Sequence, residues 1–360
     1  MNDKVMHIIS QFDFPGILKH VEPYGSGHIN DTFRLTYNDG ELNHYYILQK
    51  LNTDIFTRPE ELMENIVNVT KFLKNKVIEN GGDPERETLN VINTKDNKSF
   101  YKYEDEYWRV FVFVSNAECY DEVKCDEDFY ESAYAFGKFQ SLLSDYPAHT
   151  LHETIYNFHN TAVRYERFKE VVKADVKGRV KDVQDEINFV MDHDYLSHAL
   201  ADMNLPLRVT HNDTKLNNIM IDKDTHKGIC VIDLDTVMPG LAANDFGDAI
   251  RFGASTGAED EVDLSKIECD MHLFEVYTKG FIEGCQGHLT KEELLALPYG
   301  AMTMTYECGM RFLTDHLEGD VYFKIHRENH NLDRALTQFK LVADMESKLE
   351  TMTEIVKKYM

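Results

Sequence analysis

The sequence is poor in positive charge. Among 360 residues, 38 are Lys or Arg and 63 are Asp or Glu, which gives a formal net charge of −25. A surface of this sign repels polyanions, so we expect neither nucleic acid nor an anionic membrane as a partner. An apolar run of about 18 residues, the length that crosses a bilayer, is missing as well. The first 16 residues do not follow the pattern of a secretory signal. These features predict a cytoplasmic protein.

Paired cysteines and flexible linkers are also missing. Six cysteines are scattered along the chain without a Cys-x-x-Cys pair, which argues against a disulfide framework and predicts buried, reduced thiols. They are Cys119, Cys125, Cys230, Cys269, Cys285 and Cys308. No stretch rich in Gly, Ser or Pro marks a linker. A chain of this length is nevertheless too long for one compact core, so we expect two lobes of unequal size, residues 1–114 and 115–360.

The first lobe has the pattern of an antiparallel sheet. Residues 33–37 alternate between apolar and polar, Asn38-Asp39-Gly40 has turn chemistry, and residues 45–49 return. Apolar residues at helical spacing then predict a helix over 60–80, which Gly81-Gly82 would end. Three more short strands are expected, around 89–93, 99–103 and 107–114. This lobe is therefore predicted to be a small sheet of about five strands with one inserted helix.

The second lobe is predicted to be mostly helical. Apolar residues recur at helical spacing in several segments, at 129–143, 163–173, 180–193, 271–283, 299–316 and 332–359. One short strand pair, 219–221 and 229–232, interrupts them. The expected fold class is therefore α+β, with a small N-terminal β lobe and a large, mostly α-helical C-terminal lobe. A cleft between two such lobes is a favoured place for a ligand site.

Four polar residues carry the strongest functional signal: His211, Asp213, Asn218 and Asp233. If residues 223–228 form the turn of the strand pair, Asp222 pairs with Ile229, and Asn218 then falls opposite Asp233. An amide oxygen and a carboxylate would meet at the open end of the hairpin. Magnesium prefers such oxygen ligands together with phosphate oxygens. Asp213 lies on the loop before the hairpin, within reach of a substrate hydroxyl.

This order of residues is the layout of a phosphoryl-transfer site, with one catalytic Asp and an Asn and an Asp for metal ions. The pattern His-x-Asp-x-x-x-x-Asn, a short hairpin and Ile-Asp resembles the superfamily of aminoglycoside phosphotransferases and choline kinases, relatives of protein kinases. The resemblance implies a kinase-like bilobal fold, ATP as co-substrate and Mg²⁺ as cofactor. A second acidic pair, Asp245 and Asp248, is expected to begin a helix and brace the catalytic loop.

The N-terminal lobe should then cover the nucleotide. Gly25 and Gly27 precede a strand and would let backbone amides approach the phosphates. The strand 47–50 should bring the lysine that pairs with phosphate, but Gln49 occupies the expected position and Lys50 is one residue late. Adjacent strand residues point to opposite faces, so the choice between Gln49 and Lys50 stays open. The helix offers two glutamates as partners for such a lysine, Glu61 and Glu64.

The resemblance extends further, to the N-acetylhexosamine 1-kinase family. It rests on segments along nearly the whole chain, at residues 22–30, 46–49, 208–218, 232–240, 245–256 and 307–323. That family transfers the γ-phosphoryl group of ATP to O1 of N-acetylglucosamine or N-acetylgalactosamine. The resemblance implies that Asp213 is the catalytic base and that Asn218 and Asp233 bind magnesium. It also implies three residues near the sugar, His28, Arg311 and Tyr322.

Two alternatives remain open at this stage. A related kinase could act on another acceptor, such as an aminoglycoside, homoserine, choline or methylthioribose. Choline would call for an aromatic cage and an aminoglycoside for an acidic pocket. A pseudokinase that binds nucleotide without turnover is the second alternative, and only the displaced lysine favours it. The sequence decides neither the preferred sugar epimer nor the oligomeric state nor the number of magnesium ions.

Overall fold

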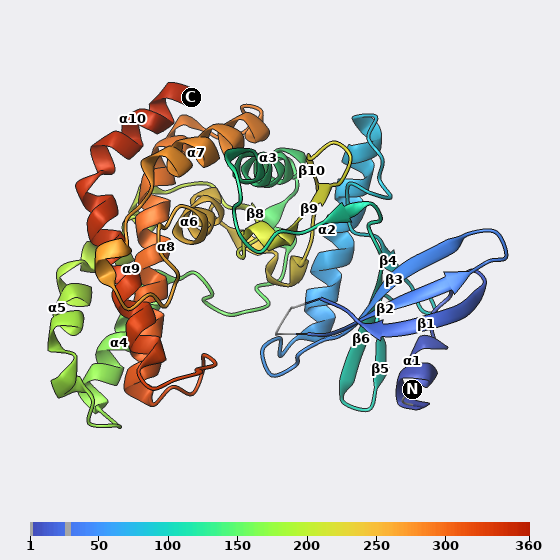
Figure 1. The fold of residues 1–360 in the computed structure, drawn as a ribbon, viewed down its shortest axis with the longest axis horizontal. Coiled ribbons are helices and arrows are strands. Elements are labelled where there is room, and N and C mark those ends of the chain that lie inside the picture. The colour runs from blue at the N-terminus through green and yellow to red at the C-terminus, as the bar shows by residue number, and fades with distance from the viewer. Residues whose placement is uncertain (1–2, 26–29) are drawn as a thin grey trace. The chain divides into compact units, whose positions relative to one another are not determined.

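The computed structural model describes residues 3–25 and 30–360 (Figure 1). The chain divides into two compact units. The first comprises Met1–Cys119, Thr150–Ile155 and Met220–Met238, and the second comprises Tyr120–His149, Tyr156–Ile219 and Pro239–Met360. Residues 220–238 therefore group with the N-terminal part of the chain. The domain division at residues 114 and 115 stays a prediction.

The first unit is built on an antiparallel sheet in the order β1-β2-β3-β6-β4, with β5 paired to β6. Its strands are β1 (Ile17–Pro23), β2 (Asp31–Asn38), β3 (Asn43–Lys50), β4 (Val91–Ile92), β5 (Tyr101–Tyr103) and β6 (Glu106–Val112). The predicted sheet is confirmed, but β1 was not foreseen. No residue of this edge strand is fully buried, so its sequence lacks a clear apolar alternation.

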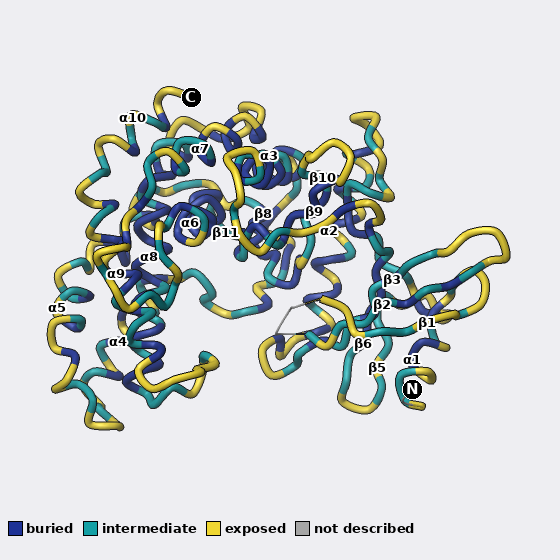
Figure 2. The backbone as a smooth tube through the Cα atoms, in the orientation of Figure 1, coloured by how far each residue is buried: buried dark blue, intermediate teal, exposed yellow. Residues whose placement is uncertain are grey.

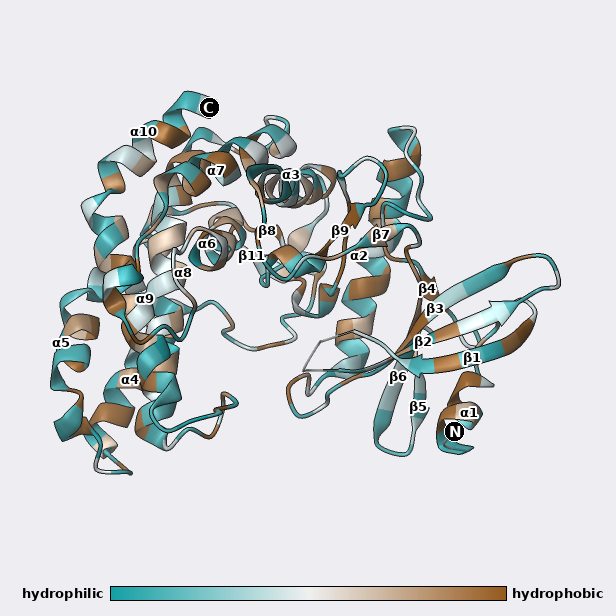
Figure 3. Ribbon diagram, in the orientation of Figure 1, coloured by the Kyte–Doolittle hydropathy of each residue, from teal (hydrophilic) through white to brown (hydrophobic). Residues whose placement is uncertain are grey.

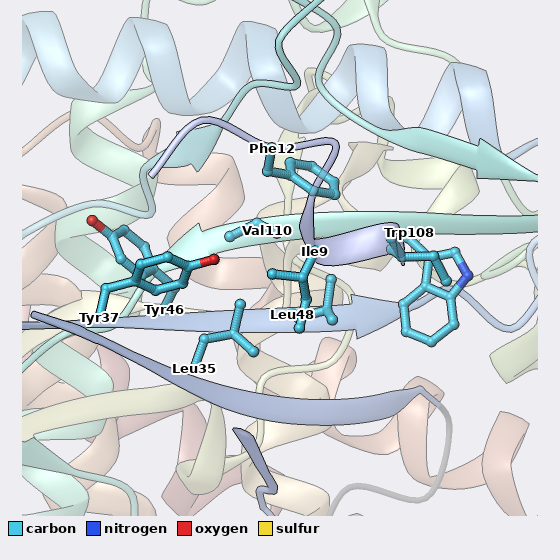
Figure 4. Packing of buried hydrophobic residues seen from close by; sticks show 9 residues of the cluster. Ile9, Phe12, Leu35, Tyr37, Tyr46, Leu48, Trp108 and Val110 are labelled. Carbon is cyan, nitrogen blue, oxygen red and sulfur yellow. The ribbon is translucent and has the colours of Figure 1, made fainter. Parts of the chain in front are cut away.

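One face of this sheet carries the core of the unit. Helix α1 (Asp3–Ile9) and the segment after it lie over the strands, as Figure 4 shows for Ile9 and Phe12 above Leu48 and Val110. Trp108, the only tryptophan of the chain, belongs to the same cluster. Strand side chains alternate between faces. The residues next to these, Gln49 and Arg109 among them, therefore point to the opposite face.

Helix α2 (Pro59–Glu79) serves that opposite face. It begins with proline in its first turn, where the missing N–H costs no hydrogen bond. Its apolar stripe is buried, at Leu62, Ile66, Val69, Leu73 and Val77. Figure 3 shows the resulting change between apolar and polar residues along this helix. The helix predicted over 60–80 is confirmed.

The predicted hairpin is present, but its register differs from the one drawn on the sequence. Strands β9 (Ile219–Asp222) and β10 (Gly228–Val231) pair, with β7 (Ala117–Glu118) on the other side of β9. Asp222 N–H donates to the carbonyl of Lys227 at 2.9 Å, and His226, at φ 56°, donates to the carbonyl of Asp222. The turn therefore closes at Lys227, and the expected pairing of Asp222 with Ile229 is wrong. A left-handed bulge residue that is not glycine shortens the turn.

The second unit is mostly helical, as predicted. Its helices are α3 (Asp126–Leu142), α4 (Thr161–Ala174), α5 (Gln184–Asp192), α6 (Ala242–Gly253), α7 (Met271–Cys285), α8 (Lys291–Glu318), α9 (His330–Ser347) and α10 (Leu349–Tyr359). Helix α6 is buried along almost its whole length (Figure 2). A Cβ on Gly247 would lie 2.3 Å from the carbonyl oxygen of Gly300, so these glycines allow α6 and α8 to pack closely. Strands β8 (Arg208–Thr210) and β11 (Met238–Gly240) form a separate pair.

Helix α8 begins eight residues before the predicted start at residue 299. Thr290 and Glu293 form a capping box, and Pro298 lies inside the helix. Proline usually marks a helix boundary, which explains the error in the prediction. Here Glu293 is also fixed by an ion pair with Arg208 at 2.7 Å. Cap and packing together outweigh the hydrogen bond that the proline removes.

The helix predicted over 332–359 is two helices. The break between α9 and α10 falls at Lys348, whose ammonium donates to the carbonyl of Cys269 and pairs with Asp344. The predicted helix 180–193 likewise begins with a 3₁₀ turn before α5. Short 3₁₀ segments occur at Ala148–Thr150, Val180–Asp182, Asp194–Ser197, Ala201–Met203, Leu216–Asn218, Leu234–Thr236 and Leu264–Lys266.

All six cysteines are free thiols. The expectation that they are buried is wrong for Cys119 and Cys125, which are exposed. Both lie in the polar segment before α3. Within residues 3–25 and 30–360, no helix is both long and apolar enough to cross a membrane.

Candidate functional site

The loop between β8 and β9 places the predicted catalytic residues in the second unit. His211 is fully buried, with Phe136 and Phe139 at ring-centroid distances of 5.4 and 6.2 Å. Its Nδ1 lies 3.3 Å from the backbone N–H of Asp213, which donates to it. Asn212 between them has a φ of 63°. This left-handed residue turns the chain sharply, so the histidine points into the core while Asp213 stays partly exposed.

Helix α6 braces this loop, as predicted. One carboxylate, that of Asp245, accepts the backbone N–H groups of His211 and Asn212 at 2.9 and 2.8 Å. Asp248, one turn later, accepts the N–H of Thr214 at 3.0 Å. Both carboxylates are buried. Burial raises the pKa of Asp248, but Arg251 and Lys215 outweigh that effect and lower the pKa below its usual value. Burial raises the pKa of Asp245 instead, so of these two groups only Asp248 is favoured in its ionised form. The loop backbone is therefore held by two buried carboxyl groups of helix α6.

The carboxylate of Asp213 has two neighbours on its own loop. Lys215 Nζ lies 2.7 Å from Oδ1, and Asn218 Nδ2 lies 3.2 Å from Oδ2. The same Asn218 nitrogen donates to the backbone carbonyl of Asp213 at 2.8 Å. Burial lowers the pKa of Lys215, whereas Asp213 and Asp248 raise it by more, so the lysine stays charged. Sequence analysis did not single out Lys215, although its place two residues after Asp213 was visible.

A third buried carboxylate, that of Glu307 in α8, is linked to the loop through His159. His159 Nδ1 lies 2.9 Å from it, and Thr161 Oγ1 donates to it at 2.6 Å. Burial raises the pKa of Glu307, but His159, Arg164 and Arg311 outweigh it and lower the pKa to about 2. The other ring nitrogen of His159 lies 3.5 Å from the carbonyl of Asn212. Glu307 and His159 thus connect α8 with the catalytic loop.

The two described residues predicted to contact the sugar lie together. Arg311 of α8 lies among three aromatic rings, with its guanidinium carbon 6.0 Å from the ring centre of Tyr322. The other two rings are Phe158 and Phe323. Tyr322 is 66% exposed, although its backbone is fixed: the N–H donates to Asp315 at 2.8 Å. Asp315 also accepts the N–H groups of Val321 and Phe323, so one buried carboxylate holds the loop after α8.

The glycine turn belongs to the first unit. Gly25 has a φ of +83° and open space where a Cβ would lie, a backbone conformation that suits glycine. Gly27 and His28 lie outside the described residues.

Gln49 and Lys50 occupy opposite faces of the sheet. Lys50 is on the face of α1, where it pairs with Asp31 at 3.2 Å and Glu106 at 3.5 Å. Gln49 is on the face of α2, and its Nε2 donates to Thr32 Oγ1 at 3.2 Å. Of the two residues, only Gln49 therefore shares a face with the helix that usually supplies the glutamate partner in kinases.

The two glutamates weighed for that partnership point elsewhere. Glu61 pairs with Arg58 at 2.8 Å, and Glu64 lies 3.0 Å from His152. The residue of α2 that approaches the sheet at this point is Met63, whose sulfur lies 3.9 Å from Nη1 of Arg109. The thioether of Met63 therefore occupies the position where the glutamate partner was expected.

Asp233 is an exposed residue with a φ of 56°, directly before the 3₁₀ turn Leu234–Thr236. Asp235 two residues later is buried and forms an ion pair with Arg109, with its Oδ1 2.5 Å from Nη1. Asp235 lies in segment 232–240, on which the family resemblance rests, but no role was predicted for it or for Arg109. Two acids at positions 233 and 235 could have suggested a role for Asp235. Arg109, 126 residues earlier in the chain, could not have been recognised as its partner from the sequence.

The residues suited to magnesium are Asn218 and Asp233, and their chemistry fits the ion. Because Asn218 commits its amide nitrogen to Asp213, its oxygen Oδ1 is left to accept, and no described residue donates to it. Asp233 adds a carboxylate on an exposed turn. Nowhere among the described residues, this site included, does a group of three His, Cys, Asp or Glu side chains form a metal site. One amide, one carboxylate and phosphate oxygens are nevertheless an ordinary donor set for magnesium in kinases.

Solved kinases share this fold. A microcompartment-associated aminopropanol kinase aligns with 98% of both chains at a TM-score of 0.65 and 16% identity. Choline kinase from Cryptosporidium parvum aligns with 99% of both chains at a TM-score of 0.58 and 14% identity. Spectinomycin phosphotransferase, solved with ADP and spectinomycin, aligns with 95% of this chain and 99% of its own at a TM-score of 0.54 and 10% identity. Identities this low establish the kinase-like fold alone.

The family is established by the sequence itself. The model of the phosphotransferase enzyme family matches residues 20–268. This match covers more than half of the chain and includes the glycine turn, the catalytic loop and both acids of the hairpin. The chain belongs to the phosphotransferase enzyme family.

Proposed function

We propose that this protein is an ATP- and Mg²⁺-dependent kinase that phosphorylates the anomeric O1 of an N-acetylhexosamine. The observation that carries the proposal is the catalytic loop, where α6 fixes the backbone and leaves the Asp213 carboxylate beside Asn218 and Lys215. The family match supports phosphoryl transfer. The resemblance in the sequence supports the sugar acceptor.

In this mechanism Asp213 orients the sugar hydroxyl and accepts its proton late in the transfer. The bond from O1 to the γ-phosphorus forms while the bond from that phosphorus to the bridging oxygen breaks, which yields the sugar 1-phosphate and ADP. Magnesium, held by Asn218 and Asp233, would neutralise phosphate charge. Gly25 and Gln49 contribute donors to the phosphates. Most of the acceleration then comes from alignment and fixed charge.

Arg311 and Tyr322 are proposed to bind the sugar, because an exposed tyrosine beside a guanidinium offers both a ring face and polar donors. Choline kinase-like recognition is the alternative with a feature in its favour, since Phe158, Tyr322 and Phe323 form an aromatic group. Arg311 already places a positive charge among these rings, which disfavours binding of a cationic ligand such as choline. A neutral sugar suits this group better.

The test is ATP turnover with N-acetylglucosamine, N-acetylgalactosamine, choline, homoserine and an aminoglycoside as separate acceptors. We expect a sugar 1-phosphate, recognised by phosphorus coupling to the anomeric proton and by loss of the reducing end. The methyl glycoside, whose O1 is blocked, should not react, whereas a sugar altered at O6 should. Transfer to choline alone, or a 6-phosphate product, would contradict the 1-kinase assignment.

Arg311→Ala should raise the sugar KM with little change in the ATP KM, by a factor that corresponds to about 1.5–3 kcal/mol for a charge-assisted hydrogen bond. Tyr322→Phe should cost less because the ring remains. Arg167→Ala is a matched control, since this exposed arginine also pairs with α8, through Glu318. A defect of Arg311→Ala confined to the ATP KM would place the arginine at the phosphates instead.

A further inference from the structure

A buried arginine occupies the face of the sheet where a kinase normally keeps its lysine. Arg109 of β6 is 1% exposed and lies directly opposite Gln49 of β3 in the sheet register. Its Nε and Nη2 donate to Gln49 Oε1 at 3.1 and 2.9 Å. A charge this deep in a protein needs a partner of opposite sign.

That partner is Asp235, whose carboxylate forms a bidentate ion pair with the Arg109 guanidinium. Nη1 donates to Oδ1 at 2.5 Å and Nη2 donates to Oδ2 at 2.9 Å. Asn30 Nδ2 is the third donor to this carboxylate, at 2.8 Å from Oδ2, and its own Oδ1 accepts the N–H of Asn52. Asp235 is therefore fixed from two separate segments of the first unit.

The direction of these bonds excludes phosphate as the target of Arg109. Its Nε and both terminal nitrogens already donate to protein oxygens, and the side chain is closed off from solvent. A guanidinium in this state holds structure and does not reach a ligand. The residue that emerges to solvent is Asp233, two positions before Asp235, whereas Leu234 and Asp235 are 2% and 4% exposed.

We propose that Arg109 and Asp235 form a buried clamp that positions Asp233 for magnesium and replaces the lysine–glutamate pair of other kinases. The clamp rests on the proposed role of Asp233. The positions of that missing pair are held by Gln49, which is neutral, and by Met63, which has no charge to offer. The cation and the carboxylate instead come from β6 and the hairpin, so the clamp acts on the metal-binding turn and not on the phosphates.

Arg109→Lys tests the clamp, because lysine keeps the positive charge but cannot form the bidentate pair of hydrogen bonds to Asp235. The readout is the Mg²⁺ concentration for half-maximal binding of ADP, measured by calorimetry on the full chain, beside the thermal unfolding midpoint. We expect that concentration to rise at least ~10-fold, the loss typical of residues that orient metal ligands. Asp235→Asn should act in the same direction.

The hairpin provides a matched control. Arg86 binds the carboxylate of Asp222 at 2.7 Å, close to the hairpin's turn and away from Asp233. Arg86→Lys also weakens an arginine–aspartate pair on this hairpin, so it reports what mere loss of stability does. A shift of the Mg²⁺ requirement no larger in Arg109→Lys than in Arg86→Lys would overturn the clamp.

A second variant keeps the test decisive if Arg109→Lys does not fold. Asn30→Ala removes the other donor to Asp235 without touching the arginine, and it should raise the Mg²⁺ requirement by a smaller factor. An unchanged requirement in that variant counts against the clamp. Because ADP binding needs no acceptor, failure to phosphorylate a hexosamine would reject the proposed function and leave the clamp to be judged by its own measurement.

Discussion

At the scale of single residues, the central prediction concerns Asp213. We expect Asp213→Asn to lower kcat by at least ~10²-fold, as general-base losses do, and to leave ADP affinity nearly unchanged. Asn218 and Lys215 keep their places, so the loop should remain folded. The matched control is Asp121→Asn, which changes an exposed carboxylate that accepts a hydrogen bond from Asn217 of the same loop. Normal turnover in folded Asp213→Asn protein would move the proton acceptor to another residue.

The sequence allowed much of this site to be predicted, because its residues lie close together along the chain. Asp213, Asn218 and Asp233 stand on one loop and one hairpin, and their order along the chain, together with the family resemblance, suggested a base and metal ligands. The pairing of Asp222 with Ile229, which placed Asn218 opposite Asp233, was nevertheless wrong. Arg109 was different. Its partner Asp235 is 126 positions away, and a lone arginine in an apolar strand gives no sign that it will be buried in an ion pair. Such pairings depend on tertiary structure.

At the scale of elements, helix α8 supports several separate parts of the second unit. Over successive turns it presents Glu307 to His159, Arg311 to the aromatic rings and Asp315 to the loop that carries Tyr322. Its start at Lys291 was not predicted, because a proline such as Pro298 usually marks the boundary of a helix. The length of the hairpin turn was predicted wrongly because His226 adopts a left-handed backbone conformation, at φ 56°. Glycine usually occupies that conformation, so a histidine gives no sign of it in the sequence. Local sequence propensity gave wrong predictions of the start of α8 and of the hairpin turn, because packing determined the first and a β-bulge the second.

Glu307 makes α8 sensitive to acid. Its pKa falls from 4.5 to about 2 on folding, so its contribution to stability is complete above pH 4.5 and disappears as the pH falls toward 2. Glu307→Gln should reduce the free energy of unfolding at pH 7 by about 3 kcal/mol, as expected for breaking a buried ion pair. By linkage, the difference from wild type should narrow by about 1 kcal/mol between pH 7 and pH 4. Urea titrations at both pH values measure this, and a constant difference would mean that folding does not lower the pKa of Glu307.

At the scale of the whole molecule, chain order and compact units do not coincide. The first unit closes only with Met220–Met238, a segment that supplies Asp222 to Arg86 and Asp235 to Arg109. Without it, Arg109 would be a buried charge with no carboxylate, at a cost of about 3–5 kcal/mol, comparable to half of the stability of a small domain. We therefore expect that residues preceding the hairpin do not fold as a self-sufficient domain.

A fragment of residues 1–119 should accordingly fail to fold. Trp108 reports directly on this unit because it is the only tryptophan and is 3% exposed within the sheet core. In the fragment we expect solvent-exposed, red-shifted Trp108 emission and no cooperative urea transition. Joining residues 217–240 to the fragment through a flexible linker should restore a blue-shifted emission, and the same linked fragment with Asp235→Ala should restore less. A fragment 1–119 that folds cooperatively by itself would show that the sheet needs neither the hairpin nor the carboxylate opposite Arg109.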